Sequence, residues 1–353
     1  MRFFANWFNK WSNDIGIDLG TANTLVYVLG HGIIIDEPSV VALNRKTSRA
    51  VAVGLEAKKM LGRNPGHIEV VRPLVDGVIS DFEVTEEMLY YLINKAERLI
   101  KSRFRIRPRV VVGVPSGISN VEVRAVIDAS KSGGAREVYI VEEPMAAAIG
   151  IGLPVNDPVG SMVIDIGGGT TDIAVISLGG VVKSKNVKIA GDHLNRDIIN
   201  SIRREFKILI GEKTAEDMKI RLSSVKATDD RFEMNIRGRD LVTGLPREII
   251  VTDIDVREAI LPSVMQLIDA VKEILELTPP EIVSDVMRRG VYLTGGGALI
   301  RGLDRVIQEE MNIPVFVADD PLSAVARGAG RILEDLDLYA PVLMHENDEL
   351  PPR

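Results

Sequence analysis

Short apolar runs separated by glycine and threonine set the hydrophobic pattern of this chain. Residues 17–30 are apolar at both ends and Gly/Thr/Asn-rich between, which predicts a strand, a tight polar turn and a second strand. Residues 164–179 have the same layout, and both segments start with an apolar residue, Asp, an apolar residue and Gly. The pattern therefore predicts two matching strand pairs, far apart in the sequence.

The repetition continues after each strand pair. Residues 109–117 and 291–297 are both apolar strands that end in a small-residue turn, and residues 141–150 resemble residues 318–328. Three matches in the same order indicate a duplicated α/β unit. We therefore expect an α/β fold with two similar lobes that face one another across a cleft.

Helical periodicity fills the segments between these matches. Residues 85–103 carry apolar side chains at i, i+3 and i+4 spacing, and residues 298–310 show a similar period after a glycine triplet. Ser119 and Glu122 have the spacing of a capping box, which predicts a helix from there to about residue 132. Residues 37–76 and roughly 191–252 lie outside the repeat, and we expect a small subdomain from each.

The turns of the two predicted hairpins suit phosphate binding. Their glycines and threonines offer backbone N–H groups with little side-chain bulk, so two facing turns can hold one polyphosphate from both sides. Asp18 and Asp165 end the incoming strands and would point at the same phosphates. Carboxylates there require a hard cation, which implies Mg²⁺ held largely through water. The alternative is that each Asp only hydrogen-bonds its own turn.

Two further segments belong to the same pattern. Glu143 stands before Pro144 at the start of an alanine-rich helix, and Asp320 is its counterpart in the second repeat. Both carboxylates could serve only as helix N-terminal caps, and the sequence does not separate that from a catalytic role. The glycine triplet at residues 295–297 follows a strand, so the helix start after it could approach a nucleotide, although such triplets are often only tight turns.

Composition narrows the class of protein. The chain has 353 residues, 46% hydrophobic and 26% charged, which is typical of a globular protein with more than one lobe. The net charge of −7 argues against general nucleic-acid binding. The absence of cysteine excludes disulfide and thiolate chemistry and favours the cytoplasm. No apolar run reaches the roughly 18 residues of a membrane span.

The N-terminus has a pattern of its own. Its aromatic residues are Phe3, Phe4, Trp7, Phe8 and Trp11. On a helix they fall within an arc of roughly 140°. This predicts an amphipathic helix that inserts at the lipid headgroup boundary of a membrane. The alternative is that this face packs on the protein or on a partner. A basic segment, residues 101–109, also carries Phe104 and Ile106, and taken alone it reads equally as a solvated loop.

These motifs together carry a family likeness. The strings Asp18-Leu-Gly-Thr, Asp165-Ile-Gly-Gly-Gly-Thr-Thr, Glu142-Glu-Pro-Met-Ala-Ala-Ala and Leu293-Thr-Gly-Gly-Gly-Ala resemble the actin and heat-shock-chaperone ATPase superfamily. Longer strings resemble the MreB family of bacterial actin-like proteins, among them Asp36-Glu-Pro-Ser-Val-Val-Ala and Arg72-Pro-Leu-Val-Asp-Gly-Val-Ile. The resemblance runs from about residue 13 to residue 336.

The resemblance implies an ATPase that binds ATP and Mg²⁺ between its lobes. Glu143 would orient the water that attacks the γ-phosphate, with Thr170 helping to place it, and Lys219 would lie near the ribose and adenine. The implied nucleotide contacts are Asp18, Gly20, Thr21, Ala22 and Asn23 in the first phosphate loop, Asp165, Gly167, Gly168, Gly169 and Thr170 in the second, and Gly295, Gly296 and Gly297 in the adenosine loop. Residues 190–197 depart from the family pattern, because Asn195 and Arg196 stand where an acidic pair is common.

The resemblance also implies a filament at the inner face of the cell membrane, built from paired protofilaments with Val121 and Arg124 near the pairing contact. Membrane lipid and proteins of the cell-elongation machinery such as RodZ, MreC and MreD would be its partners. The implied division is residues 1–13 for membrane binding, 14–36, 77–147 and 321–347 for subdomain IA, 37–76 for IB, 148–190 and 253–320 for IIA, and 191–252 for IIB. A small-molecule kinase and a chaperone-type ATPase on the same fold are the alternatives.

Overall fold

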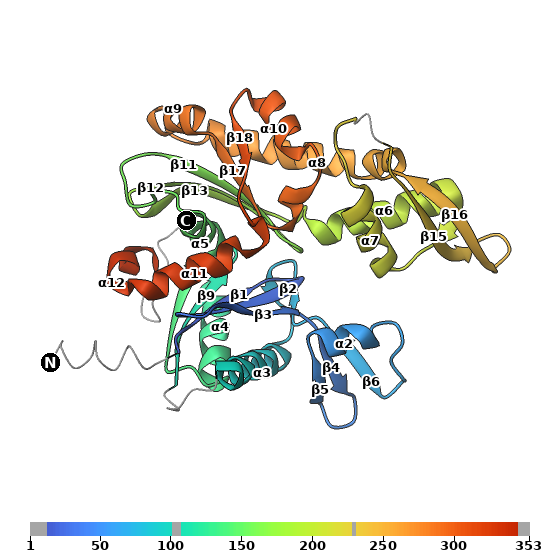
Figure 1. Cartoon of the computed structure of the whole chain (residues 1–353), viewed down its shortest axis with the longest axis horizontal. Helices are drawn as coiled ribbons and strands as arrows, with labels where there is room; N and C mark the ends of the chain where they lie inside the picture. Colours follow the sequence, from blue (N-terminus) through green and yellow to red (C-terminus); the bar gives the residue numbers. More distant parts are fainter. Residues whose placement is uncertain (1–12, 101–106, 228–230, 345–353) are drawn as a thin grey trace.

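The computed structural model describes residues 13–100, 107–227 and 231–344, which form two α/β lobes side by side (Figure 1). Within this part of the chain each lobe is built on a five-stranded sheet. The first sheet has the order β10-β9-β1-β2-β3, from Glu137–Glu142, Arg109–Val114, Ile15–Leu19, Asn23–Val28 and Gly32–Pro38. The second has the order β13-β12-β11-β17-β18, from Gly180–Val187, Thr171–Ser177, Ser161–Ile166, Val291–Thr294 and Val315–Val317.

The two sheets have one topology. Strand β1 pairs antiparallel with β2 and parallel with β9, and β11 likewise pairs antiparallel with β12 and parallel with β17. The outer parallel strands β10 and β18 also correspond. The structure confirms the predicted fold of two similar lobes.

Helices α5 (Glu143–Gly150) and α11 (Ala324–Glu334) bring the lobes together. A Cβ at Gly150 would overlap the carbonyl oxygen of Ala324, and a Cβ at Gly328 would overlap that of Ala146. The contact is reciprocal, because each helix places a glycine against a backbone carbonyl of the other segment. Glycine at both positions is required because the helix backbones touch.

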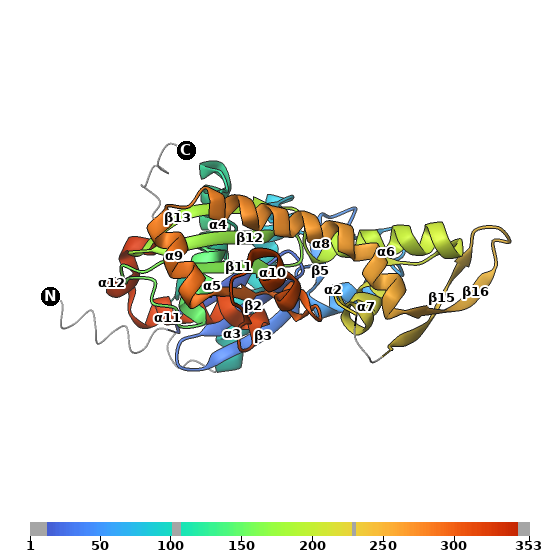
Figure 2. The ribbon, with the colours of Figure 1, turned by 90° about the horizontal axis from the view of Figure 1, so that it is seen from above.

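Two small subdomains extend from the lobes (Figures 1 and 2). The first contains the sheet β5-β4-β6, from Arg49–Val53, Val41–Asn44 and Ile68–Val71, with α2 (Leu55–Met60). The second contains β14-β15-β16, from Ile208–Leu209, Glu233–Asp240 and Pro246–Thr252, with α6 (Gly191–Phe206) and α7 (Glu212–Leu222). A hairpin of β7 (Leu74–Val75) and β8 (Val78–Ile79) follows the first subdomain.

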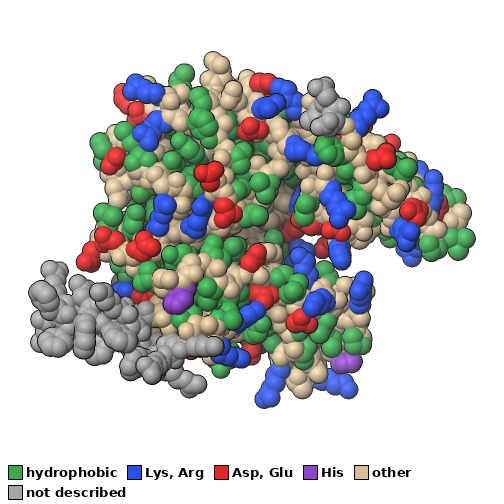
Figure 3. Space-filling view, in the orientation of Figure 1, with side chains coloured by type: hydrophobic (Ala, Val, Ile, Leu, Met, Phe, Trp, Pro, Cys, Tyr) green, Lys and Arg blue, Asp and Glu red, His purple; other side chains and the backbone are tan. Residues whose placement is uncertain are grey.

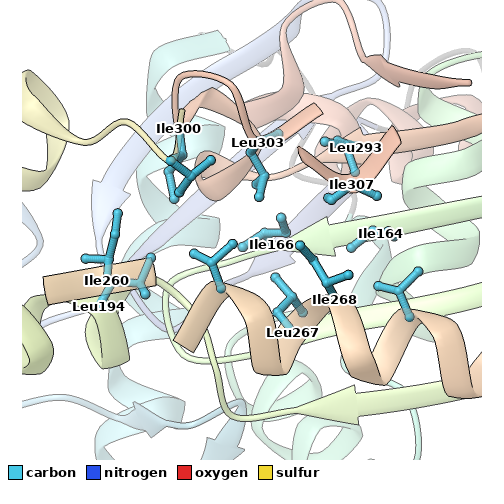
Figure 4. Close-up of a cluster of buried hydrophobic side chains, with 14 of the residues drawn as sticks. Ile164, Ile166, Leu194, Ile260, Leu267, Ile268, Leu293, Ile300, Leu303 and Ile307 are labelled. Carbon is cyan, nitrogen blue, oxygen red and sulfur yellow. The ribbon is translucent and has the colours of Figure 1, made fainter. Parts of the chain in front are cut away.

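Buried aliphatic side chains hold each lobe to its helices. In the second lobe α8 (Asp253–Glu276) lies along the sheet, with Leu267 and Ile268 directed towards Ile164 and Ile166 (Figure 4). Full burial of one such side chain stabilises the fold by about 1.5–3 kcal/mol. In the first lobe α3 (Phe82–Ile100) and α4 (Asn120–Ser132) supply the buried residues. The other helical segments are α9 Pro280–Arg289, α10 Leu303–Met311, α12 Leu336–Tyr339, η1 Gly296–Leu299, η2 Pro321–Ser323 and η3 Ala340–Val342.

Two predicted helix boundaries were wrong. Helix α3 begins at Phe82 rather than at residue 85, because Asp81 accepts a hydrogen bond from the backbone N–H of Val84 (3.1 Å). The glycine triplet does not lead into one helix over residues 298–310. A short 3₁₀ turn comes first, and α10 begins at Leu303 after Gly302, whose φ is +79°.

The capping box at α4 is confirmed: the carboxylate of Glu122 accepts from the N–H of Ser119 at 2.6 Å, and the Ser119 hydroxyl accepts from the N–H of Glu122. None of the helices in the described segments has the length and apolar character needed to span a bilayer.

Candidate functional site

The first glycine–threonine loop joins β1 to β2. A Cβ at Gly20 would lie 2.5 Å from the carbonyl oxygen of Asn23, so the tight turn requires glycine there. The hydroxyl of Ser39 donates to the carbonyl oxygen of Gly20, and Asn23 donates to Asp36 at 2.7 Å. These two bonds hold the loop on the side of Ser39 and Asp36, and Ala22 remains exposed.

The second loop joins β11 to β12 and meets the first directly. The N–H of Gly167 donates to the carbonyl oxygen of Thr170 (2.9 Å), which closes the turn. A Cβ at Gly168 would lie 2.6 Å from the Cβ of Ala22, and one at Gly169 would lie 2.6 Å from the hydroxyl oxygen of Thr21. The two predicted phosphate loops therefore face each other at the junction of the lobes.

Carboxylates gather behind these loops. Burial raises the pKa of Asp165 to about 6, against the hydrogen bond from Thr294 (2.7 Å), which lowers it. Burial, together with the charges of Asp165 and Asp36, raises the pKa of Asp18 to about 8. The two strand-end carboxylates thus repel each other in a poorly solvated place. Such a pair favours a bound cation.

Glu143 lies close to the same group of charges. Burial raises its pKa well above the usual range, and the charges of Asp172, Asp18 and Asp165 add to that effect. Glu143 is 8% exposed. It is the first residue of α5, whose N-cap is Glu142, so Glu143 is not itself the capping residue.

The repeat counterpart of Glu143 has a different environment. Asp320 is exposed, and its carboxylate accepts a hydrogen bond from the hydroxyl of Ser323 within its own turn. The sequence left open that both carboxylates are only helix caps. In the structure they do not share one role, because Glu143 follows the N-cap residue Glu142, whereas Asp320 is bonded within its own turn.

The β7–β8 hairpin covers Thr170, which is 5% exposed. The N–H of Gly77, in the turn of this hairpin, donates to the hydroxyl of Thr21 at 3.1 Å. A Cβ at Gly77, whose φ is +77°, would lie 2.9 Å from the Cγ2 of Thr170. Glycine at this position thus lets the hairpin approach both phosphate loops.

The glycine triplet packs on the end of β11. A Cβ at Gly295 (φ +77°) would overlap the carbonyl oxygen of Ile166, and one at Gly297 would overlap the Ile166 side chain. Thr294, directly before the triplet, donates to Asp165. The predicted adenosine loop is therefore adjacent to the predicted second phosphate loop.

Lys219 reaches the same region from α7. Its ammonium group donates to the carbonyl oxygen of Gly191 (3.0 Å) and to Glu216 (2.7 Å), and Asn195 also donates to Glu216 (2.6 Å). A Cβ at Gly191 would lie 3.4 Å from the carbonyl oxygen of Gly167 in the second loop. Asn195 lies in the segment that departs from the family pattern. Its amide donates a hydrogen bond to Glu216, whereas an acidic side chain at position 195 would repel the Glu216 carboxylate.

The remaining predicted residues lie elsewhere. Val121 and Arg124 are exposed on α4. The predicted membrane residues Phe3, Phe4, Trp7, Phe8, Trp11, Phe104 and Ile106 lie outside the described residues.

Sequence reasoning missed three charged residues at this junction. Asp172 is 1% exposed and accepts hydrogen bonds from Ser116 and Asn186. Arg72 contacts Asp192 and Glu212, and Glu216 holds Lys219. The three-residue spacing between Glu216 and Lys219 on a helix is the one local signal that would have indicated a pair.

Comparison with known proteins agrees with this arrangement. A model of the MreB/Mbl protein family matches residues 12–340. The chain is 50% identical over 327 residues to the cell shape-determining protein Mbl of Bacillus subtilis, covering 93% of this chain and 97% of Mbl. It is also 50% identical over 340 residues to the cell shape-determining protein MreB of Escherichia coli, covering 95% of this chain and 97% of that protein.

Solved structures give the same result. The crystal structure of MreB5 of Spiroplasma citri bound to ADP superposes with a TM-score of 0.86 at 40% identity, covering 91% of this chain and 96% of that one. The crystal structure of MreB5 bound to AMPPNP gives a TM-score of 0.84, also at 40% identity, with coverage of 92% and 97%. By family match, sequence identity and actin-like fold, the chain belongs to the MreB/Mbl family.

Proposed function

We propose that this chain binds ATP with Mg²⁺ between its lobes, hydrolyses it, and assembles into filaments on the inner face of the cell membrane. The observation that carries the proposal is the direct apposition of two glycine–threonine loops, with Asp18 and Asp165 behind them. The AMPPNP and ADP bound to MreB5 of Spiroplasma citri support it from a relative.

The donor set of the site fits Mg²⁺. Among the described residues no group of three or more His, Asp or Glu side chains is arranged so that it could hold a metal ion by itself. Mg²⁺ sites that act on nucleotides use one or two carboxylates, phosphate oxygens and water, which matches Asp18 and Asp165. When bound, Mg²⁺ would offset the negative charge of the phosphates and of these two side chains.

The hydrolytic step is the transfer of the γ-phosphoryl group to water. Positioning and electrostatics carry most of such a reaction, because the protein has little covalent chemistry to perform. In the proposed mechanism Glu143 accepts a hydrogen bond from the attacking water and the Thr170 hydroxyl helps to orient that water. Burial raises the pKa of the Glu143 carboxyl, and a raised pKa makes its carboxylate a stronger proton acceptor.

The adenosine part of ATP would lie against residues 295–297 and Lys219. Gly295–Gly297 packs closely on the end of β11, where Ile166 leaves no space for a Cβ at Gly295 or Gly297, so the backbone of this turn lies directly beside the second loop. Lys219 presents an ammonium group beside the second loop and is held by Glu216 and the carbonyl oxygen of Gly191. Adenine or ribose contacts there are the nucleoside part of the proposal.

Exposed apolar side chains on the outer surface support self-assembly. The β15–β16 hairpin projects from the molecule (Figure 1), and Val242 and Leu245 near its tip are 82% and 65% exposed. On another face, Val121 of α4 is 77% exposed. A head-to-tail contact that does not close into a ring propagates as a filament, and a second contact pairs two filaments. We assign Val121 and Arg124 to the second contact.

The cellular role follows from the relatives that carry the name cell shape-determining protein. We propose an actin-like cytoskeletal role in rod-like cell shape, with the filament organising cell-wall synthesis. The aromatic N-terminus and the Phe104–Ile106 segment would hold the filament on membrane lipid. RodZ, MreC and MreD are the proposed protein partners, and nucleic acid is not one.

Binding and imaging together test this function. Wild-type protein should bind ATP more tightly with Mg²⁺ than with EDTA, and electron micrographs with Mg-ATP on anionic liposomes should show paired filaments. Asp165→Asn should lose most of the Mg²⁺ effect on ATP affinity, because the carboxylate facing the phosphates is gone. Asp240→Asn is the matched control, since Asp240 holds a turn in the distant β15–β16 hairpin through Val242 and Thr243. If wild-type protein binds neither ATP nor ADP, the proposal is wrong.

A further inference from the structure

The turn at residues 115–117 joins β9 to α4, and carboxylates on two sides hold it. The backbone N–H of Ser116 donates to Oδ1 of Asp172 over 2.7 Å, in a buried hydrogen bond. The backbone N–H of Gly117 donates to the carboxylate of Glu142, the N-cap of α5. Because β12, which carries Asp172, belongs to the second sheet and β9 to the first, this short turn is tied to both lobes.

Asp172 is itself fixed within the second sheet. Its other carboxylate oxygen accepts a hydrogen bond from the Asn186 side chain (2.9 Å), and the two residues are register partners on β12 and β13. Asp172 is 1% exposed, and its strand begins at Thr171, directly after Thr170. Any displacement of the second loop along β12 therefore moves Asp172 with it.

Helix α4 lies at the other end of the connection. It begins at Asn120, only a few residues after Ser116, and its capping box at Ser119 and Glu122 makes the first turn rigid. Val123 is buried against the first sheet, whereas Val121 and Arg124 face outwards. A shift of the turn at residues 115–117 would therefore also move the exposed face of α4, because only residues 118–119 lie between the turn and the helix.

We propose that Asp172 is a positioning residue that couples the second phosphate loop to α4 through the backbone N–H of Ser116. The inference rests on the proposed function, because the loop must hold a nucleotide whose state can change. Asp172 does not itself contact the nucleotide in this proposal. Coupling between the nucleotide site and α4 requires a connecting element whose position both of them affect. We assign that part to the Asp172–Ser116 hydrogen bond between the two sheets.

The Ser116 side chain takes no part in the coupling. Its hydroxyl oxygen is buried and has no hydrogen-bond partner among the described residues. Only its backbone N–H meets Asp172. Ser116→Ala therefore removes the hydroxyl and leaves the proposed connection in place, which makes it a control at the same point of the chain.

Hydrogen–deuterium exchange of the full chain, kept unassembled at low protein concentration, measures the coupling directly. Exchange is followed with Mg-ADP and with Mg-AMPPNP at two segments, residues 165–171 and residues 116–124. In the wild type the two nucleotides should give exchange rates at residues 116–124 that differ by about fivefold or more, the lower end of usual allosteric effects. Residues 165–171 should be protected by both nucleotides.

Asp172→Ala should remove the coupling between residues 165–171 and residues 116–124. Protection at residues 165–171 should persist, with AMPPNP affinity changed by less than about threefold, while the nucleotide difference at residues 116–124 falls below about twofold. A merely structural role would raise exchange at residues 116–124 equally with both nucleotides and leave their ratio unchanged. If Asp172→Ala does not fold, Asp172→Asn replaces it; the Asn oxygen still accepts from Ser116, and more than half of the nucleotide difference should remain.

The outcomes are distinct. A wild-type protein with no protection at residues 165–171 would contradict the proposed function as well as the coupling. Protection there without any nucleotide difference at residues 116–124 would overturn the coupling alone. A full nucleotide difference in Asp172→Ala, or its loss in Ser116→Ala, would also overturn the assignment of Asp172.

Discussion

Arg72 donates to the carboxylate of Asp192 over 2.9 Å and so joins the segment after the first small sheet to the start of α6 in the other lobe. A second contact runs from Arg72 to Glu212 of α7 at 3.0 Å. In the space-filling view, acidic and basic side chains meet where the two small subdomains face each other (Figure 3). Arg72 therefore links the lobes on the side of the two small subdomains.

Arg72→Ala should speed nucleotide release. The Arg72 side chain is 35% exposed and Glu212 64%, so each ion pair contributes about 0–1 kcal/mol. Losing both should raise the rate of release of a fluorescent ATP analogue by about twofold to tenfold, since about 1.4 kcal/mol is tenfold. Stopped-flow displacement measures that rate. Arg237→Ala, which breaks an exposed pair with Glu248, is the control and should release nucleotide at the wild-type rate.

Asp18 should make the nucleotide-free protein less stable as pH rises. Burial first, and then the charges of Asp165 and Asp36, raise its pKa to about 8 in the folded state, whereas the unfolded value is near 3.8. The folded state therefore binds more protons than the unfolded state between these values, and stability falls with rising pH by up to about 1.4 kcal/mol per pH unit from this group. Asp18→Asn should remove this loss.

Thermal unfolding at pH 5 and pH 8 without nucleotide checks the Asp18 prediction. The melting temperature of Asp18→Asn relative to wild type should be higher at pH 8 than at pH 5. The same variant should bind Mg-ATP more weakly at pH 8. An equal offset at both pH values would mean that Asp18 does not titrate in this range.

Val121→Glu should give single filaments. Val121 is 77% exposed on α4, so the substitution costs the isolated subunit little but places a charge in the proposed pairing contact. Electron micrographs with Mg-ATP should show unpaired filaments of normal length. Met287→Glu on α9 is a comparable exposed apolar site, 54% exposed, and should leave paired filaments. Paired filaments in the Val121 variant would place the contact elsewhere.

A chain lacking Met1–Asn13 should assemble but bind lipid poorly. Burial of one large apolar side chain contributes about 1.5–3 kcal/mol, and less at an interface, so loss of Trp7 and Trp11 alone shifts partitioning by an order of magnitude or more. Many anchors along one filament act together, so intact filaments should bind where monomers do not. Co-sedimentation with anionic liposomes measures this. Equal pelleting of both chains would assign the aromatic face to protein packing instead.

Local sequence signals predicted the two lobes and the facing loops. Asp18 and Asp165 each end a strand before a glycine–threonine turn, and turn chemistry of that kind is specified by neighbouring residues. The capping box at Ser119 was readable for the same reason. Asp81 carried an equally local capping signal, and reading it would have placed the start of α3 correctly.

The sequence pattern did not predict which individual side chains pair between distant segments. Asp172 meets Ser116, 56 residues away, and Arg72 meets Asp192, 120 residues away. No periodicity or spacing predicts such a pair, because each partner looks like an ordinary turn or surface residue until the lobes are placed. The break at Gly302 was missed because apolar periodicity continues across it, although its φ of +79° ends the preceding turn.

Single-turnover hydrolysis of ATP by Glu143→Ala tests the central claim most directly, that water attacks ATP beside Glu143 between the lobes. ATP should bind within about threefold of the wild-type affinity, while the hydrolysis rate should fall by about 10²-fold or more, as for a lost base. Thr170→Ala should slow the same step less. Asp320→Asn, the repeat counterpart on the exposed turn, should hydrolyse ATP at the wild-type rate. Wild-type hydrolysis by both Glu143→Ala and Thr170→Ala would contradict the account.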